Sequence, residues 1–278
     1  WKIGEARRAP EHLPRFGTGQ AGRKPLAGVR AIAPLHCLAQ ATISASVSLP
    51  KIPKQRAILD RRKLTAAIED IVAEKGASSG RQAIVEVMKA ALDAGREELA
   101  KRLLEKPGAG HEAAHGHAFL IDQLIRIIHD HVIDDVYPVH NRTSGERLAL
   151  IAVGGYGRGE MCPHSDVDIA FVTPDKPTAW CEQVIEAILY YLWDLNLTVG
   201  HSSRSLNEVV RMAKEDLTIR TALLEGRFLW GDQEVYDAAS NRFWTEVVPG
   251  TERQFVSEKL AERDARHKRM GDSRYVVE

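Results

Sequence analysis

The chain has 278 residues, 44% of them hydrophobic, and its 38 basic side chains balance 38 acidic ones. This is the composition of an ordinary globular protein, with enough chain for one large domain or two small ones. No apolar run approaches the roughly 18 residues of a membrane span. The three cysteines are scattered and form no C-x-x-C pair, so we expect a cytoplasmic protein with neither a zinc site nor a disulfide framework.

The balanced total hides an uneven distribution of charge. Residues 1–56 hold 10 Lys or Arg and 2 Asp or Glu, a net +8, so residues 57–278 hold 28 and 36, a net −8. A basic arm can bind nucleic acid or a membrane surface. However, residues 1–56 contain six prolines and many glycines and lack a sustained hydrophobic period, which predicts a disordered segment. We therefore expect neither nucleic acid nor a membrane as a partner.

Residues 57–140 have the periodicity of a helical N-terminal region. Apolar positions from Ile58 predict a helix that ends at Lys75-Gly76. The pattern Ser79–Gln82 resembles a capping box and predicts a second helix to about Glu105. A third long helix is predicted over Ala113–Val136, before Pro138.

The next stretch reads as a strand, a glycine turn and a second strand. Leu148–Val153 is an apolar run of strand length, and Gly154–Glu160 is rich in glycine. The second strand, Ser165–Val172, begins with Asp166 and Asp168, which share one face because side chains alternate along a strand. Two neighbouring carboxylates repel each other unless a cation lies between them, and Mg²⁺ combines carboxylates with substrate phosphates. The pattern therefore predicts a site for a metal-bound nucleoside triphosphate.

Each residue of this predicted site has an expected role. Asp166 and Asp168 are the expected catalytic and metal-binding residues, holding two Mg²⁺ ions or sharing one with the triphosphate. The expected reaction is in-line attack on the α-phosphorus, catalysed mainly by positioning and electrostatics. The remaining candidates are expected to bind the nucleotide: Gly154, Gly155, Gly157, Arg158, Ser165 and Arg204.

Several of these residues have equally ordinary alternatives. Arg158 can form a structural salt bridge with Glu160, and Ser165 can cap the start of the strand. Arg204 can be a surface arginine, and His201 is better explained as structural than as catalytic. A further group can form an internal ion-pair network instead of contacting substrate: Arg220, Glu225 and Arg227.

Three better-known motifs fit the sequence less well. A dinucleotide fingerprint counted from Gly155 needs a third glycine where Glu160 stands, and a P-loop needs a lysine that does not follow the glycines. Residues His111–His115 read H-E-A-A-H, as in zinc proteases, but no known downstream pattern places a third ligand. We therefore expect a chance match there.

After the second strand, the sequence predicts mainly helices. Residues 141–204 form the expected core, and residues 205–278 form the expected helical region that follows it. The predicted elements are a helix from Thr178 to about Leu195, a strand at Leu197–Ser202, a helix from a capping box at Ser205–Glu208, a helix from Asp216 to Gly231, and helices at Asp232–Val247 and Thr251–Arg269.

The central motif, GG-x-G-x-G-E-x(4)-SD-x-D, resembles the nucleotidyltransferase superfamily of DNA polymerase β. Its longer form, VGGYGRGEMCPHSDVDI, resembles the bifunctional PII uridylyltransferase/uridylyl-removing enzymes of bacterial nitrogen regulation, as do the flanking VYPVHN, WDLNLTVGHSSRS and DLTIRTALLEGRFLWGD. The resemblance covers roughly residues 58–278. It implies an α+β fold with a small mixed sheet, and Mg²⁺-dependent transfer of UMP from UTP to a tyrosine of PII with release of pyrophosphate.

The sequence departs from the superfamily pattern at one point. A third carboxylate is usual on a later strand, but Leu197–Ser203 contains none, and Thr198 stands at the expected place. Asp194, Asp216 or Glu225 can substitute, or the site has two carboxylates only.

The resemblance also implies which activities to expect elsewhere. The family continues through HD and ACT domains, so we expect uridylyl removal and glutamine sensing to lie outside this chain. Other hypotheses are a nucleotidyltransferase acting on another protein or a small molecule, such as an adenylyltransferase, and a non-catalytic nucleotide-binding module.

Overall fold

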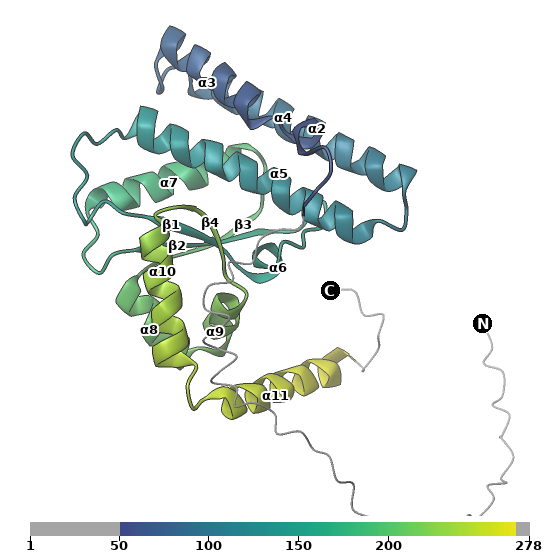
Figure 1. Cartoon of the computed structure of the whole chain (residues 1–278), viewed down its shortest axis with the longest axis vertical. Coiled ribbons are helices and arrows are strands. Elements are labelled where there is room, and N and C mark those ends of the chain that lie inside the picture. Colours follow the sequence, from purple (N-terminus) through teal and green to yellow (C-terminus); the bar gives the residue numbers. More distant parts are fainter. Residues whose placement is uncertain (1–50, 271–278) are drawn as a thin grey trace, which may run out of the picture.

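The computed structural model describes residues 51–270, so the predictions for residues 1–50 and 271–278 lie outside the described residues. The protein is an α+β fold in which helices cover both faces of a four-stranded mixed sheet (Figure 1). The strand order is β3-β2-β1-β4; β1 is antiparallel to β2 and β4, and β2 is parallel to β3. This confirms the predicted fold class. The strands are β1 (Ala149–Ala152), β2 (Val167–Thr173), β3 (Val199–Ser205) and β4 (Arg227–Gly231).

One face of the sheet packs against the helices of the N-terminal half and α7. Leu150, Phe171 and Leu229 point to this face and join one large apolar core. The cause is the alternation of side chains along each strand, which gives the sheet two apolar faces. The helices on this side are α2 (Gln55–Ile58), α3 (Arg61–Lys75), α4 (Arg81–Glu105), α5 (Gly110–His131) with the π-helical η1 (Val132–Val136), and α7 (Ala179–Asp194) (Figure 1).

The opposite face packs against later helices. Ala149, Ile151 and Val172 point to this face and contact a smaller core that includes Val209 and Val235. The helices here are α8 (Leu206–Glu215), α9 (Leu217–Leu224) and α10 (Gln233–Arg242) with the π-helical η2 (Phe243–Val247); the short α6 (Gly154–Gly157) follows β1, and α11 (Glu252–Met270) extends beyond the layers (Figure 1).

Helix capping shows which local signals were reliable. The predicted box at Ser205 is present: its hydroxyl accepts from the Glu208 amide, and the Glu208 carboxylate accepts from the Ser205 amide. The predicted box at Ser79 is wrong, because α4 has Gly80 at its N-cap without any side-chain cap. Thr178 stands at the N-cap of α7, also without a side-chain bond.

The helix predicted from Asp216 to Gly231 is half wrong. Asp216 does cap α9, but that helix ends at Leu224, and Arg227–Gly231 forms β4. β4 pairs with the free edge of β1, a contact between segments roughly eighty residues apart that helical periodicity cannot reveal. Because β4 completes the sheet, it also brings Arg227 next to the glycine turn.

Within residues 51–270, no helix combines the length and apolar character needed to cross a membrane.

Candidate nucleotide and metal site

The glycine turn is built from close backbone approaches. Gly154 has φ +61° and Gly159 has φ +75°, conformations that glycine adopts without strain. A Cβ at Gly157 would stand 2.2 Å from the Glu225 carbonyl oxygen, so any side chain there would clash with the backbone. The Gly157 amide bonds back to Val153, whereas the amides of Gly154 and Gly155 begin α6 and have no carbonyl one turn earlier.

The acidic pair lies beside this turn. Asp168 is in β2, and Asp166 immediately precedes the strand. The Asp168 Oδ2 atom is 3.3 Å from the place where a Cβ on Gly154 would stand. Asp166 is exposed and Asp168 is half-buried. The structure therefore brings the start of the glycine turn and the predicted metal ligands together at one end of the sheet.

Electrostatics at the pair favour a cation. Burial raises the pKa of Asp168, and the negative charge of Asp166 raises it further. Among the ion pairs of residues 51–270, none involves either carboxylate. Adjacent carboxylates without a protein cation have the donor chemistry of a Mg²⁺ site that is completed by substrate phosphates. The residues present therefore fit this metal.

None of the three candidate third carboxylates joins the pair. Asp194 pairs with Arg81 at 2.6 Å, and Asp216 accepts bonds from the first amides of α9. Glu225 pairs with Arg158 at 2.8 Å. Over the described part of the chain, no group of three His, Cys, Asp or Glu side chains is placed to hold a metal. The geometry favours the two-carboxylate alternative.

A cleft of about 230 Å³ opens beside Asp168, between β2, β3 and α9. Arg204 lines the same cleft, although along β3 it stands opposite Val172 while Gly200 stands opposite Asp168. Its Nε donates to Met212 Sδ at 3.2 Å. Sequence reasoning missed Gly200, where a Cβ would stand 2.2 Å from Asp168 Oδ1. A glycine inside a strand often marks a close approach of another group, so the position of Gly200 in the predicted strand could have indicated this contact. Gly200 leaves the space that the Asp168 carboxylate occupies.

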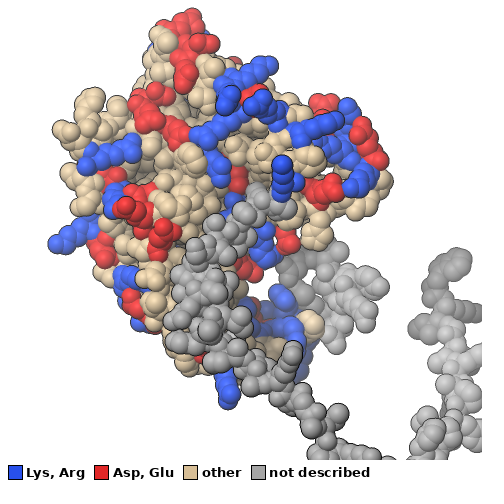
Figure 2. Space-filling model, in the orientation of Figure 1, with Lys and Arg blue, Asp and Glu red and all other residues tan. Residues whose placement is uncertain are grey.

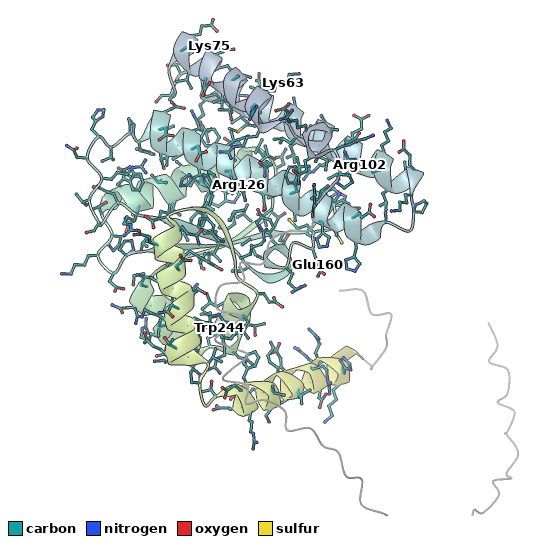
Figure 3. All side chains as sticks on the ribbon, viewed as in Figure 1. Lys63, Lys75, Arg102, Arg126, Glu160 and Trp244 are labelled. Carbon is teal, nitrogen blue, oxygen red and sulfur yellow. The ribbon has the colours of Figure 1, made fainter. Side chains whose placement is uncertain are left out.

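The other two nucleotide-binding candidates make internal contacts. Arg158 bridges Glu160 at 3.1 Å and Glu225 at 2.8 Å, which is the salt-bridge alternative. Ser165 Oγ accepts from the Cys162 amide at 2.9 Å, which stabilises the loop before β2. Neither contact involves the acidic pair. Both side chains shape the loop between α6 and β2, in which Figure 3 labels Glu160.

Two side chains hold the glycine turn from the side of α5. The buried Arg227 donates to both carboxylate oxygens of Asp122 at 2.8 and 3.0 Å, and to the carbonyls of Tyr156 and Gly157 at 3.2 Å each. His115 on α5 lies 2.8 Å from the Gly159 carbonyl through Nδ1. The ion-pair alternative for Arg227 is therefore observed. Asp122 was missed, although an acidic residue within an apolar helix seam was a usable signal.

The structure also explains the remaining sequence candidates. Arg220 is buried and donates to the Val247 carbonyl and to Thr251. His201 packs edge-on against Trp193, as expected for a structural histidine. The H-E-A-A-H match places His115 on a backbone carbonyl, and no third metal ligand lies near it in residues 51–270.

Residues 95–199, which contain the glycine turn and the acidic pair, match the DUF294 nucleotidyltransferase family. The chain is 70% identical over 230 residues to the bifunctional uridylyltransferase/uridylyl-removing enzyme of Novosphingobium aromaticivorans, covering 83% of this chain and 25% of that protein. It is 63% identical over 229 residues to the Erythrobacter litoralis protein of the same name (82% and 25%). The Rhodospirillum rubrum protein is 50% identical over 233 residues (84% and 25%).

A mixed sheet with a glycine turn and an acidic pair, together with the matched family, defines the chain as a nucleotidyltransferase. More particularly, most of its length is similar to part of the bifunctional uridylyltransferase/uridylyl-removing enzymes. The chain spans about a quarter of the length of the relatives it matches.

Proposed function

We propose that this chain transfers UMP from UTP to a tyrosine hydroxyl of the regulatory protein PII and releases pyrophosphate. The observation that supports this most is an acidic pair, next to a glycine turn, that has no cationic partner within the described part of the chain. The chain is also 70% identical over 230 residues to a protein named as a uridylyltransferase. The reaction class follows from the site. The printed name of the relatives supports uridylyl transfer, whereas UTP and PII are inferred from the resemblance of the motif. A cytoplasmic location is inferred from the scattered cysteines.

In this proposal Asp166 and Asp168 hold Mg²⁺. The ion, when bound, neutralises charge on the triphosphate and lowers the barrier to hydroxyl attack. The amides of Gly154 and Gly155 donate to phosphate oxygens, since they have no partner one turn earlier. Arg204 contributes positive charge from the cleft that it shares with Asp168.

Labelled-nucleotide transfer tests the proposal. The protein is incubated with Mg²⁺, PII and each α-labelled triphosphate in turn, and the variant Asp166→Asn/Asp168→Asn is compared with wild type. Label from UTP alone is expected, with a loss of at least about a hundredfold in the variant because metal-ion stabilisation supplies several kcal/mol. Glu69→Gln/Asp70→Asn, which neutralises two exposed carboxylates on α3, is the matched control and should transfer normally.

The other outcomes identify the alternatives. Label from ATP alone would contradict uridylyl transfer and favour an adenylyltransferase. Nucleotide binding without transfer would favour a nucleotide-binding module, an alternative supported by the two-carboxylate geometry. A full-length relative serves as the positive control, so that failure of transfer by this chain can be separated from failure of the assay.

A further inference from the structure

A second cleft, of about 640 Å³, shares no lining residue with the cleft beside Asp168. Its walls come from α2, the first residues of α3, the middle of α5, and β4. This volume is within the usual range of small-molecule sites, roughly 300–1,000 Å³. The cleft is therefore large enough for a ligand that the proposed UMP transfer does not require.

The walls of this cleft are strongly basic. They contain five arginines and two aspartates, a formal charge of 5 − 2 = +3. Both aspartates are already engaged: Asp122 pairs with Arg227, and Asp60 accepts the first amides of α3. Arg61 pairs with Asp130 at 2.6 Å. The positive charges of the other arginines in the cleft are therefore not neutralised by the carboxylates that line it.

Three arginines of the cleft have no carboxylate partner in residues 51–270: Arg56, Arg62 and Arg126. Arg56 and Arg62 are exposed. Arg126 is held in place, since its Nε donates to the Leu229 carbonyl and its guanidinium lies 5.0 Å from the centre of the Trp230 ring. Figure 3 labels Arg126 on α5, and Figure 2 shows basic side chains gathered over the same face.

Arginine is the side chain best suited to phosphate, because its planar fork can donate two parallel hydrogen bonds. Guanidinium groups that line one cleft repel one another, and an anion bound in the cleft would offset this repulsion. The half-buried rings of Phe119 and Phe228 add apolar surface to the wall. We propose that this cleft, defined by Arg56, Arg62 and Arg126, binds a small molecule that carries a diphosphate group.

One residue of the cleft also contacts the glycine turn. Arg227 lines the cleft and also donates to the carbonyls of Tyr156 and Gly157. A bound diphosphate would therefore lie against the residue that holds the turn. The inference is independent of uridylyl transfer, because no residue of the acidic pair takes part.

Calorimetric titration with inorganic pyrophosphate tests the site. EDTA is present throughout, so that Mg²⁺-dependent binding at the acidic pair does not contribute. Wild type is expected to bind, and Arg56→Ala/Arg62→Ala to bind at least tenfold more weakly. The matched control is Arg253→Ala/Arg266→Ala, which removes two exposed arginines from α11 and should bind as wild type does.

Three results would overturn the proposal: no binding by wild type, equal binding by all three proteins, or equal weakening in both variants, which would show general attraction to basic surface. If Arg56→Ala/Arg62→Ala misfolds, Arg56→Lys/Arg62→Lys takes its place. This variant keeps the positive charge but loses the planar fork of arginine, so its affinity for pyrophosphate should lie between that of wild type and that expected for the alanine variant. Repeating the titration with a nucleoside diphosphate identifies the source: tighter binding than pyrophosphate indicates a nucleotide, and equal binding indicates the diphosphate alone.

Discussion

The glycine turn has carboxylates on two sides, and the protein treats them in opposite ways. Asp122, on the side of α5, is buried and bonded through both oxygens to Arg227. Asp166 and Asp168, on the side of β2, have each other as neighbours and no cationic partner among residues 51–270. The buried charge is satisfied within the fold, whereas the half-exposed pair is left to interact with something that the fold does not supply.

This difference separates the carboxylate that stabilises the fold from the carboxylates that are available to bind a cation. Removing one partner of a buried pair leaves an uncompensated charge, so Asp122 and Arg227 should matter to stability. A pair that repels itself in the metal-free protein should matter little to stability, and greatly to the binding of a cation. Four predictions test this separation, in order of decreasing effect.

Arg227→Met should lower the free energy of unfolding by about 3–5 kcal/mol, because it leaves Asp122 buried without a partner. Urea unfolding followed by circular dichroism measures the change. The double variant Asp122→Leu/Arg227→Met should lose less, since it buries no unpaired charge. A loss below about 1 kcal/mol in the single variant would show that the pair does not support the fold.

Mg²⁺ should stabilise wild type by about 2.7 kcal/mol at one hundred times its dissociation constant, because it binds the folded state. Thermal unfolding with and without the ion measures this, and EDTA should reverse it. Asp166→Asn/Asp168→Asn should show no such gain. An equal gain in that variant would place the metal away from the acidic pair.

Gly200→Ala should reduce nucleotidyl transfer about tenfold, or ~1.4 kcal/mol, because the new methyl group would stand 2.2 Å from Asp168 Oδ1 and displace the carboxylate. The measurement is the initial rate as a function of Mg²⁺ concentration. Gly110→Ala is a suitable control, since its Cβ would meet nothing within 4 Å. A normal rate for Gly200→Ala would mean that Asp168 tolerates displacement.

Asp168→Asn should slightly raise the melting temperature of the metal-free protein at pH 7. The pKa of Asp168 is raised in the folded state, so folding binds a proton there, and wild type loses stability as the pH rises through this titration. The asparagine does not titrate, so its advantage should be largest above that range and disappear on acidification. Melting curves from pH 4 to 8 measure it, and an advantage that grows towards pH 4 would contradict the assigned cause.

The sequence was most informative where the signal is local. The strand at Leu148–Val153 and the cap at Ser205 were predictable because alternation and capping depend on neighbouring residues. β4 was not predictable from the sequence, because it forms only by pairing with β1, which is distant along the chain. For the same reason the partners of Arg158 and Arg227 remained open: their alternatives differ only in which distant carboxylates the fold brings near.

The bond between Asp122 and Arg227 joins residues 105 positions apart. Every predicted catalytic and nucleotide-binding residue lies between them, yet the support that Arg227 gives to the turn requires β4 to pair with β1. Contacts between such distant residues form slowly, because the long intervening segment must be closed first. A shorter piece of this protein that keeps the whole motif and stops before residue 227 should therefore assemble a sheet edge without a formed nucleotide site.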